Sequence, residues 1–136
     1  MSLHHVELWV PDLERAVAEW GWLLGELGWT PFQDWPAGRS WCSGDVYVVV
    51  EASSAVTGPH DRMRAGLNHL AFHGGDRAAV DALAAAAPEH GWTPLFADRY
   101  PWAGGPDHYA AYLENADGFE VEVVAQGLVE NDVAVD

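Results

Sequence analysis

Two histidines and two glutamates occupy matching places in the two halves of this 136-residue chain. His5 and His69 lie 64 residues apart, each near the start of an alternating segment, while Glu51 and Glu122 lie in later apolar segments. Imidazole nitrogens combined with carboxylate oxygens favour divalent Ni, Co, Zn, Fe or Mn. Two neighbouring carboxylates in an apolar setting are also destabilising unless a cation accompanies them. We therefore expect these four side chains to hold a divalent metal ion.

The first half of the chain has the pattern of a strand, a helix and three further strands. Residues 3–10 (LHHVELWV) alternate between two faces, which is typical of a strand. Asp12 is a good helix N-cap, and apolar residues then recur at helical spacing until Gly28. Glycines and prolines divide the rest into three predicted strands, at residues 29–34, 39–43 and 45–52.

The second half repeats this order, which indicates one module written twice. Its predicted elements are a strand at 67–73, a helix from 76 to about 90, and strands at 92–97, 108–114 and 119–125. The repeat is also visible in the letters, since GWTPF at 28–32 matches GWTPLF at 91–96. We expect one domain at 1–126, with modules at 3–52 and 67–125, a linker at 53–66 and an acidic C-terminal tail at 127–136.

Composition excludes several classes of partner. Six basic residues against 21 acidic ones give a formal net charge of −15, which repels phosphate backbones and anionic lipids. We expect no nucleic-acid partner and no membrane association, because no apolar run approaches the roughly 18–20 residues of a membrane span. The single cysteine, Cys42, cannot form an internal disulfide and fits a reducing compartment, so we expect a cytoplasmic protein.

Three segments give the chain a family resemblance. The stretches LHHVELWVPDLERAV, GLNHLAFHGGDRAAVDAL and AAYLENADGFEVEVV resemble the vicinal oxygen chelate superfamily, which includes glyoxalase I, extradiol dioxygenases and bleomycin-resistance proteins. The resemblance implies an α+β fold in which two tandem βαβββ modules form an open barrel-like cup, with a metal at its base. It places the family's ligand positions on His5, Glu51, His69 and Glu122, and it implies a homodimer. The register at the end of the strand that carries Glu51 can shift. Without Glu51, the other three still form a two-histidine, one-carboxylate set.

Five further residues are candidates for contact with substrate: Trp9, His73, Trp102, His108 and Tyr109. Trp9 shares the face of His5, and His73 shares the face of His69, where it either lines the cup or supports the ligands. Trp102 lies in a loop at 98–107 that is able to close over a ligand. His108 and Tyr109 border that loop, and the alternatives for them are substrate contact or a hydrogen-bonded loop anchor.

The favoured function is a metal-dependent, glyoxalase-like enzyme of lyase, isomerase or dioxygenase type. Its small organic substrate would have two neighbouring oxygens chelated to the metal, and Glu122 or Glu51 would transfer the proton as the catalytic residue. The alternative is a metal-free binding protein, similar to the bleomycin-resistance branch, that sequesters a hydrophobic antibiotic or natural product. The eight tryptophans favour this alternative, because they suit a flat or hydrophobic ligand.

Overall fold

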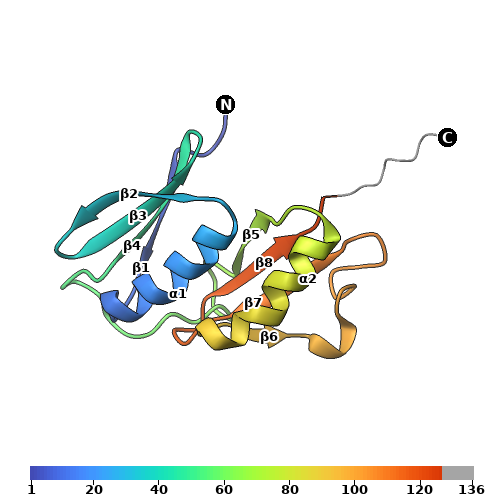
Figure 1. Ribbon diagram of the computed structural model, residues 1–136. Helices are drawn as coiled ribbons and strands as arrows, with labels where there is room; N and C mark the ends of the chain where they lie inside the picture. Colours follow the sequence, from blue (N-terminus) through green and yellow to red (C-terminus); the bar gives the residue numbers. More distant parts are fainter. Residues whose placement is uncertain (127–136) are drawn as a thin grey trace. The chain divides into compact units, whose positions relative to one another are not determined.

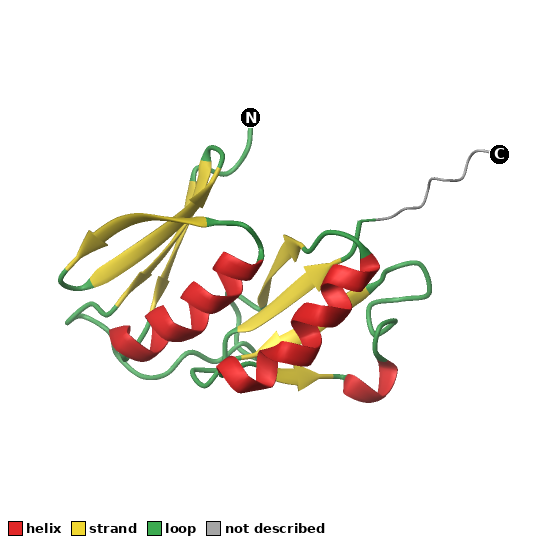
Figure 2. Cartoon of the chain, viewed as in Figure 1, coloured by secondary structure: helices red, strands yellow, loops and turns green. Residues whose placement is uncertain are grey.

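The computed structural model describes residues 1–126, and these form two compact units that divide between His60 and Asp61 (Figure 1). This division falls inside the linker predicted at residues 53–66. The acidic tail predicted at 127–136 lies outside the described residues. Each unit consists of one four-stranded sheet and one long helix (Figure 2). No helix in residues 1–126 has the length and apolar character needed to cross a membrane.

The first unit has the predicted order of elements. These are β1 (His5–Trp9), α1 (Leu13–Glu26), β2 (Thr30–Trp35), β3 (Gly38–Ser43) and β4 (Val46–Glu51). The strands lie in the order β1-β4-β3-β2, with β1 parallel to β4 and the other pairs antiparallel.

Local sequence explains why α1 begins and ends where it does. The carboxylate of Asp12 accepts a hydrogen bond from the backbone N–H of Arg15, at 3.0 Å, which satisfies one free donor of the first turn. Gly28 follows the helix with a φ of 87°, a conformation that glycine adopts without strain. The apolar side of the helix includes Trp20 and Leu24, which are both fully buried. This burial supplies most of the helix's stability.

The second unit repeats the order with two short 3₁₀ turns added. Its elements are β5 (His69–His73), α2 (Arg77–Ala86), η1 (Ala87–His90), β6 (Thr93–Leu95), η2 (Ala97–Arg99), β7 (Ala110–Glu114) and β8 (Glu120–Val124). The strand order is β5-β8-β7-β6, and β5 is parallel to β8. The two βαβββ modules and the α+β class are therefore confirmed, with an open sheet in each module.

Two predicted elements of the second unit differ in detail from the structure. The helix expected to reach about residue 90 does reach His90, but from Ala87 it continues as the 3₁₀ turn η1, because Pro88 has no N–H to donate to the α-helical ladder. The strand expected at 92–97 is shortened to the three residues of β6. Phe96 ends it by adopting a φ of 56°, in the left-handed region that breaks strand pairing.

The sheet of the second unit has one apolar face and one polar face. Val121 and Val123 of β8 are fully buried, and a methyl group added at Gly74 would contact both Val123 and Val80 of α2. The alternate residues of β8, Glu120 and Glu122, therefore lie on the face away from α2. This polar face carries the candidate site.

Candidate functional site

Glu122 is the centre of a polar cluster in the second unit. Its side chain is only 8% exposed. Oε1 lies 3.1 Å from Nε2 of His69, and Oε2 is hydrogen-bonded to Nε2 of His108. The structure thus brings together two of the expected metal ligands, His69 and Glu122, and adds a second imidazole.

The hydrogen bonds of His69 define its tautomer. Its Nδ1 lies 2.7 Å from Oδ1 of Asn68, an oxygen that only accepts, so Nδ1 carries the proton. In the neutral imidazole, Nε2 then directs a lone pair at the carboxylate of Glu122, which also carries only lone pairs when ionised. Two such acceptors repel each other unless a proton or another cation lies between them. A histidine whose Nδ1–H is held in this way has the usual arrangement of a metal-ligating imidazole.

Tyr112 borders the same carboxylate. It is the direct neighbour of Glu122 in the pairing of β7 with β8. Burial, together with the negative charge of Glu122, raises the pKa of the Tyr112 phenol to about 12, so it stays protonated at neutral pH. Gly104, in the loop before β7, lies close to both Tyr112 and His108. A methyl group built there would lie 2.5 Å from the Tyr112 hydroxyl and 2.7 Å from Cδ2 of His108.

His108 is expected at the border of the loop, and its contact with Glu122 was not among the predicted contacts. The alternation of β7 could have found it. Tyr112 faces Glu122, and stepping back by two residues from Tyr112 leads through Ala110 to His108. Extending that period past the start of the strand places the imidazole on the Glu122 side.

Two more carboxylates on this face share one arginine. Arg62 forms ion pairs of 3.2 Å with both Glu114 and Glu120. The side chain of Glu120 is 4% exposed, so its charge is strongly desolvated. Arg62 therefore balances one of the two negative charges that lie beside Glu122 on its own strand and on β7.

In the first unit, His5 lies exposed on β1. Its ring stacks on Tyr47 with ring centres 4.7 Å apart and planes 6° apart, and its Nδ1 lies 2.9 Å from Nδ1 of His4. Trp9 lies on the same face of β1 and is 46% exposed. Its indole N–H donates to a carboxylate oxygen of Glu7, at 2.8 Å.

Strand register contradicts the equivalence of Glu51 with Glu122. In the second unit Glu122 pairs with Ala71, two residues after His69, and the matching position in the first unit is Val49, which pairs with Glu7. Glu51 pairs instead with Trp9, four residues beyond His5, or about 13 Å along the strand. The first module therefore has an apolar side chain where the second has its central carboxylate. The error arose because every residue from Val46 to Val50 is apolar or aromatic, so the sequence does not define the register.

The other expected substrate contacts are divided between two places. His73 is exposed at the end of β5, on the face of His69. Tyr109 and Trp102 instead pack beside α2: the Tyr109 hydroxyl donates to Asp81 at 2.7 Å, and the two rings meet edge to face at 5.3 Å. Tyr109 thus has the contact of a loop anchor, which was the second alternative for it.

Within residues 1–126, no group of three or more His, Cys, Asp or Glu side chains is arranged to hold a metal ion. The expected ligands are divided between the two units, with His5 in the first and the directly contacting pair of His69 and Glu122 in the second. The donor types fit a divalent metal, because an imidazole nitrogen of His69 and a buried carboxylate oxygen of Glu122 lie 3.1 Å apart.

The sequence matches the model of one protein family. The glyoxalase/bleomycin resistance protein/dioxygenase superfamily profile matches residues 4–112. The uncharacterized protein YqjT of Bacillus subtilis (strain 168) is 43% identical over 125 residues, which are 90% of this chain and 98% of YqjT.

Solved structures give the same result. A candidate glyoxalase from Bacillus halodurans is 45% identical, with a TM-score of 0.86 over 91% of this chain and 95% of its own. A glyoxalase/bleomycin resistance protein from Albidiferax ferrireducens T118 is 25% identical, with a TM-score of 0.74 over 92% of this chain and 98% of its own.

Proposed function

Because the chain belongs to the glyoxalase/bleomycin resistance protein/dioxygenase superfamily, we propose that it is a metal-dependent enzyme for a small substrate with two neighbouring oxygens. In this proposal His69 and Glu122 of the second unit bind a divalent Ni, Co, Zn, Fe or Mn ion. His5 of the first unit stays a predicted ligand. Glu51 is left out of the set, since its register places it well away from His5 along the strand. The reaction is of lyase, isomerase or dioxygenase type, since the fold is compatible with each of them.

One observation carries the proposal. Nε2 of His69 lies 3.1 Å from Oε1 of the buried Glu122 carboxylate, while Nδ1 of the same ring lies 2.7 Å from Oδ1 of Asn68. An imidazole nitrogen and a carboxylate oxygen held this close together suit a shared divalent cation. Such a cation also offsets the unfavourable burial of an ionised carboxylate.

The bound ion would polarise the substrate's oxygens and stabilise negative charge that develops on them. The surrounding side chains would orient the substrate and move its proton. Glu122 would accept a proton from the substrate and return it, as a general base and then a general acid. His108 contacts Oε2 and would fix the carboxylate's orientation, and the protonated Tyr112 would donate a hydrogen bond to it.

Metal binding tests this proposal directly. We expect untagged protein, purified without chelator, to contain about one transition-metal ion per chain by elemental analysis. His69→Ala and Glu122→Gln should lower metal affinity by at least about 100-fold in calorimetric titrations, because each removes a direct ligand. The matched control is His90→Ala, at the end of η1 on the α2 side of the sheet, which should retain the parent affinity. Equal losses in all three variants, or protein that binds none of the five metals, would refute the proposal.

A panel of vicinal-oxygen compounds then addresses the reaction. An α-hydroxy ketone, a 1,2-diol and a catechol represent the substrate classes, and turnover should depend on the metal that stabilises the protein most. The homodimer and the cytoplasmic location stay predictions, and light scattering on the purified protein checks the first.

The second candidate is a metal-free protein that binds a hydrophobic natural product. Trp9 favours it, because a 46% exposed indole on the His5 face offers a flat apolar surface. Metal-free protein whose tryptophan fluorescence is quenched by an aromatic antibiotic would support this candidate. Loss of that quenching in Trp9→Ala would locate the ligand.

A further inference from the structure

A groove lies on the α2 side of the second unit, between α2 and the edge strand β6. Its volume is about 300 Å³. Asp81 and Ala84 line it from α2, Ala111 and Leu113 from β7, and Tyr100 from the loop that follows η2. Ala111 and Leu113 alternate with Tyr112 along β7, so they face away from Glu122. The groove and the Glu122 cluster therefore use opposite faces of the sheet, and Tyr112 borders both.

Small side chains create this space. Ala84, Ala85, Ala97 and Ala111 all border the groove, where larger apolar residues would fill it. Elsewhere along α2, Val80 and Leu83 are buried against the sheet in the ordinary way. A concave surface lined mainly by apolar atoms is stabilised when a ligand with an apolar body replaces the water in it.

One negative charge lies at the edge of the groove. The hydroxyl groups of Tyr100 and Tyr109 both donate to the same oxygen of Asp81, Oδ1, and Oδ2 accepts from neither of them. These two hydrogen bonds lower the pKa of the Asp81 carboxyl, which is therefore ionised at neutral pH. Because the Tyr100 hydroxyl already donates to Asp81, the group left to bind a ligand at the edge of the groove is the ionised Asp81 carboxylate.

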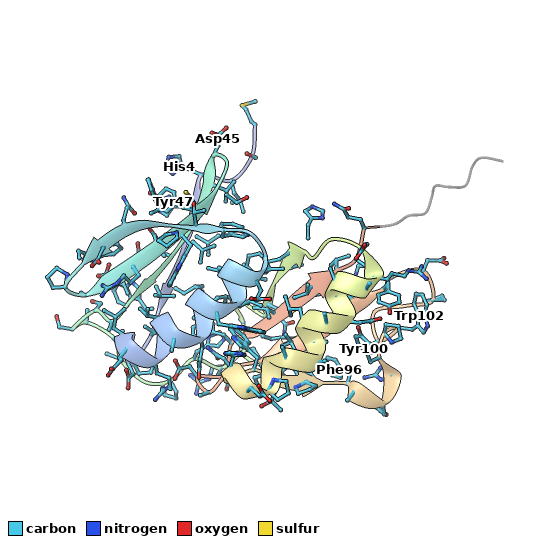
Figure 3. All side chains as sticks on the ribbon, viewed as in Figure 1. His4, Asp45, Tyr47, Phe96, Tyr100 and Trp102 are labelled. Carbon is cyan, nitrogen blue, oxygen red and sulfur yellow. The ribbon has the colours of Figure 1, made fainter. Side chains whose placement is uncertain are left out.

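The neighbouring cation on α2 is turned toward aromatic rings. The guanidinium of Arg77 lies 4.7 Å from the ring centre of Tyr109 and 5.4 Å from the ring centre of Trp102. Figure 3 shows Tyr100 and Trp102 in the same loop region. The formal net charge of −15 further favours a positively charged ligand over an anionic one.

We propose that this groove binds a small primary amine with a compact hydrophobic body. The ammonium group donates to Asp81, and the body packs on Ala84 and Ala111. The site is separate from the proposed metal site, and neither proposal depends on the other.

Three probes of one shape test the charge preference: 2-phenylethylamine, 2-phenylethanol and 3-phenylpropionate, titrated into the full chain by NMR. The amine should bind about tenfold more tightly than the alcohol, as expected for a charge-assisted hydrogen bond, and the carboxylate should not bind measurably. Asp81→Asn keeps an acceptor for the two tyrosine hydroxyls and should reduce the amine's affinity to that of the alcohol. Equal affinities of amine and alcohol for the parent protein would overturn the proposal.

A second variant tests the groove without altering the charge. Ala84→Leu fills the space with a good helix former and should weaken both the amine and the alcohol by about tenfold or more. Its control is Ala82→Leu, on the exposed side of the same helix, which should bind as the parent does. His69→Ala should also bind the amine normally, which separates this site from the metal site. Unchanged binding in Ala84→Leu would place the amine elsewhere and refute the proposal.

Discussion

Arg62 offers the sharpest test of how charge is balanced around Glu122. Replacing it by methionine keeps most of the apolar stem but leaves Glu120 without its 3.2 Å partner. Removing one partner of a fully buried ion pair destabilises a protein by about 3–5 kcal/mol, whereas an exposed pair contributes about 0–1 kcal/mol. The Glu120 side chain is 4% exposed and the Arg62 side chain 21%, so the carboxylate is buried and the guanidinium is partly in contact with solvent. We expect Arg62→Met to lower the free energy of unfolding by about 2 kcal/mol, between these limits.

Urea denaturation at neutral pH, followed by tryptophan fluorescence, measures this difference. In thermal unfolding the same change corresponds to roughly 6 °C, at about 3 °C per kcal/mol for a chain of this size. The double variant Arg62→Met/Glu120→Gln should regain at least half of the lost stability, because its buried carboxylate is replaced by an uncharged amide. Arg64→Met is the control, since Arg64 pairs with Asp61 at 3.3 Å while 80% exposed. An Arg62→Met effect within 0.5 kcal/mol of this control, or no recovery in the double variant, would refute the reasoning.

Three further predictions concern packing, the metal ligand and pH. Gly74→Ala should lower the free energy of unfolding by about 1–3 kcal/mol in urea denaturation, because the added Cβ would lie 2.4 Å from Val123. The control is Gly25→Ala, where the Cβ would meet open space, and it should be neutral or stabilising by up to about 1 kcal/mol. Asn68→Ala should weaken metal binding by about 10–100-fold with little effect on the melting temperature, since it releases the imidazole that it orients. The pKa of Asp81 in the folded chain lies below its ordinary 3.8. The stability that the ionised carboxylate contributes is therefore complete above pH 3.8 and is lost as the pH falls through the lowered pKa. Thermal unfolding across pH should show that the stability difference between the parent and Asp81→Asn shrinks below pH 3.8.

Most of the fold could be predicted because its signals are local. Asp12 and Asp76 accept hydrogen bonds from the backbone N–H groups three residues later, as N-cap residues do, and both helices begin where these caps predict. Alternation also placed His5 and His69 on the polar faces of their strands. The differences in the second unit follow from Pro88 and Phe96, whose effects depend on backbone conformations that periodicity does not reveal.

The candidate site could be predicted only in part, because it depends on pairing between distant strands. His69 and Glu122 meet as expected, since their strands are adjacent and parallel. Glu51 was matched to Glu122 by its place near a strand end, but register is set by hydrogen bonding to β1, and that places Val49 at the equivalent position. His108 lies two residues before β7, so its contact with Glu122 is predicted only when the alternation of that strand is extended into the preceding loop.

The position of β8 has a consequence for how the second unit is made. This strand is the last of the unit in sequence, yet it lies between β5 and β7 in the sheet. During synthesis, about 50 residues must follow β5 before its parallel neighbour β8 leaves the ribosome. The apolar side chains of β5 stay exposed to solvent until then. Assembly of this half is thus governed by pairing across a wide sequence separation, which slows folding and leaves nascent chains open to aggregation.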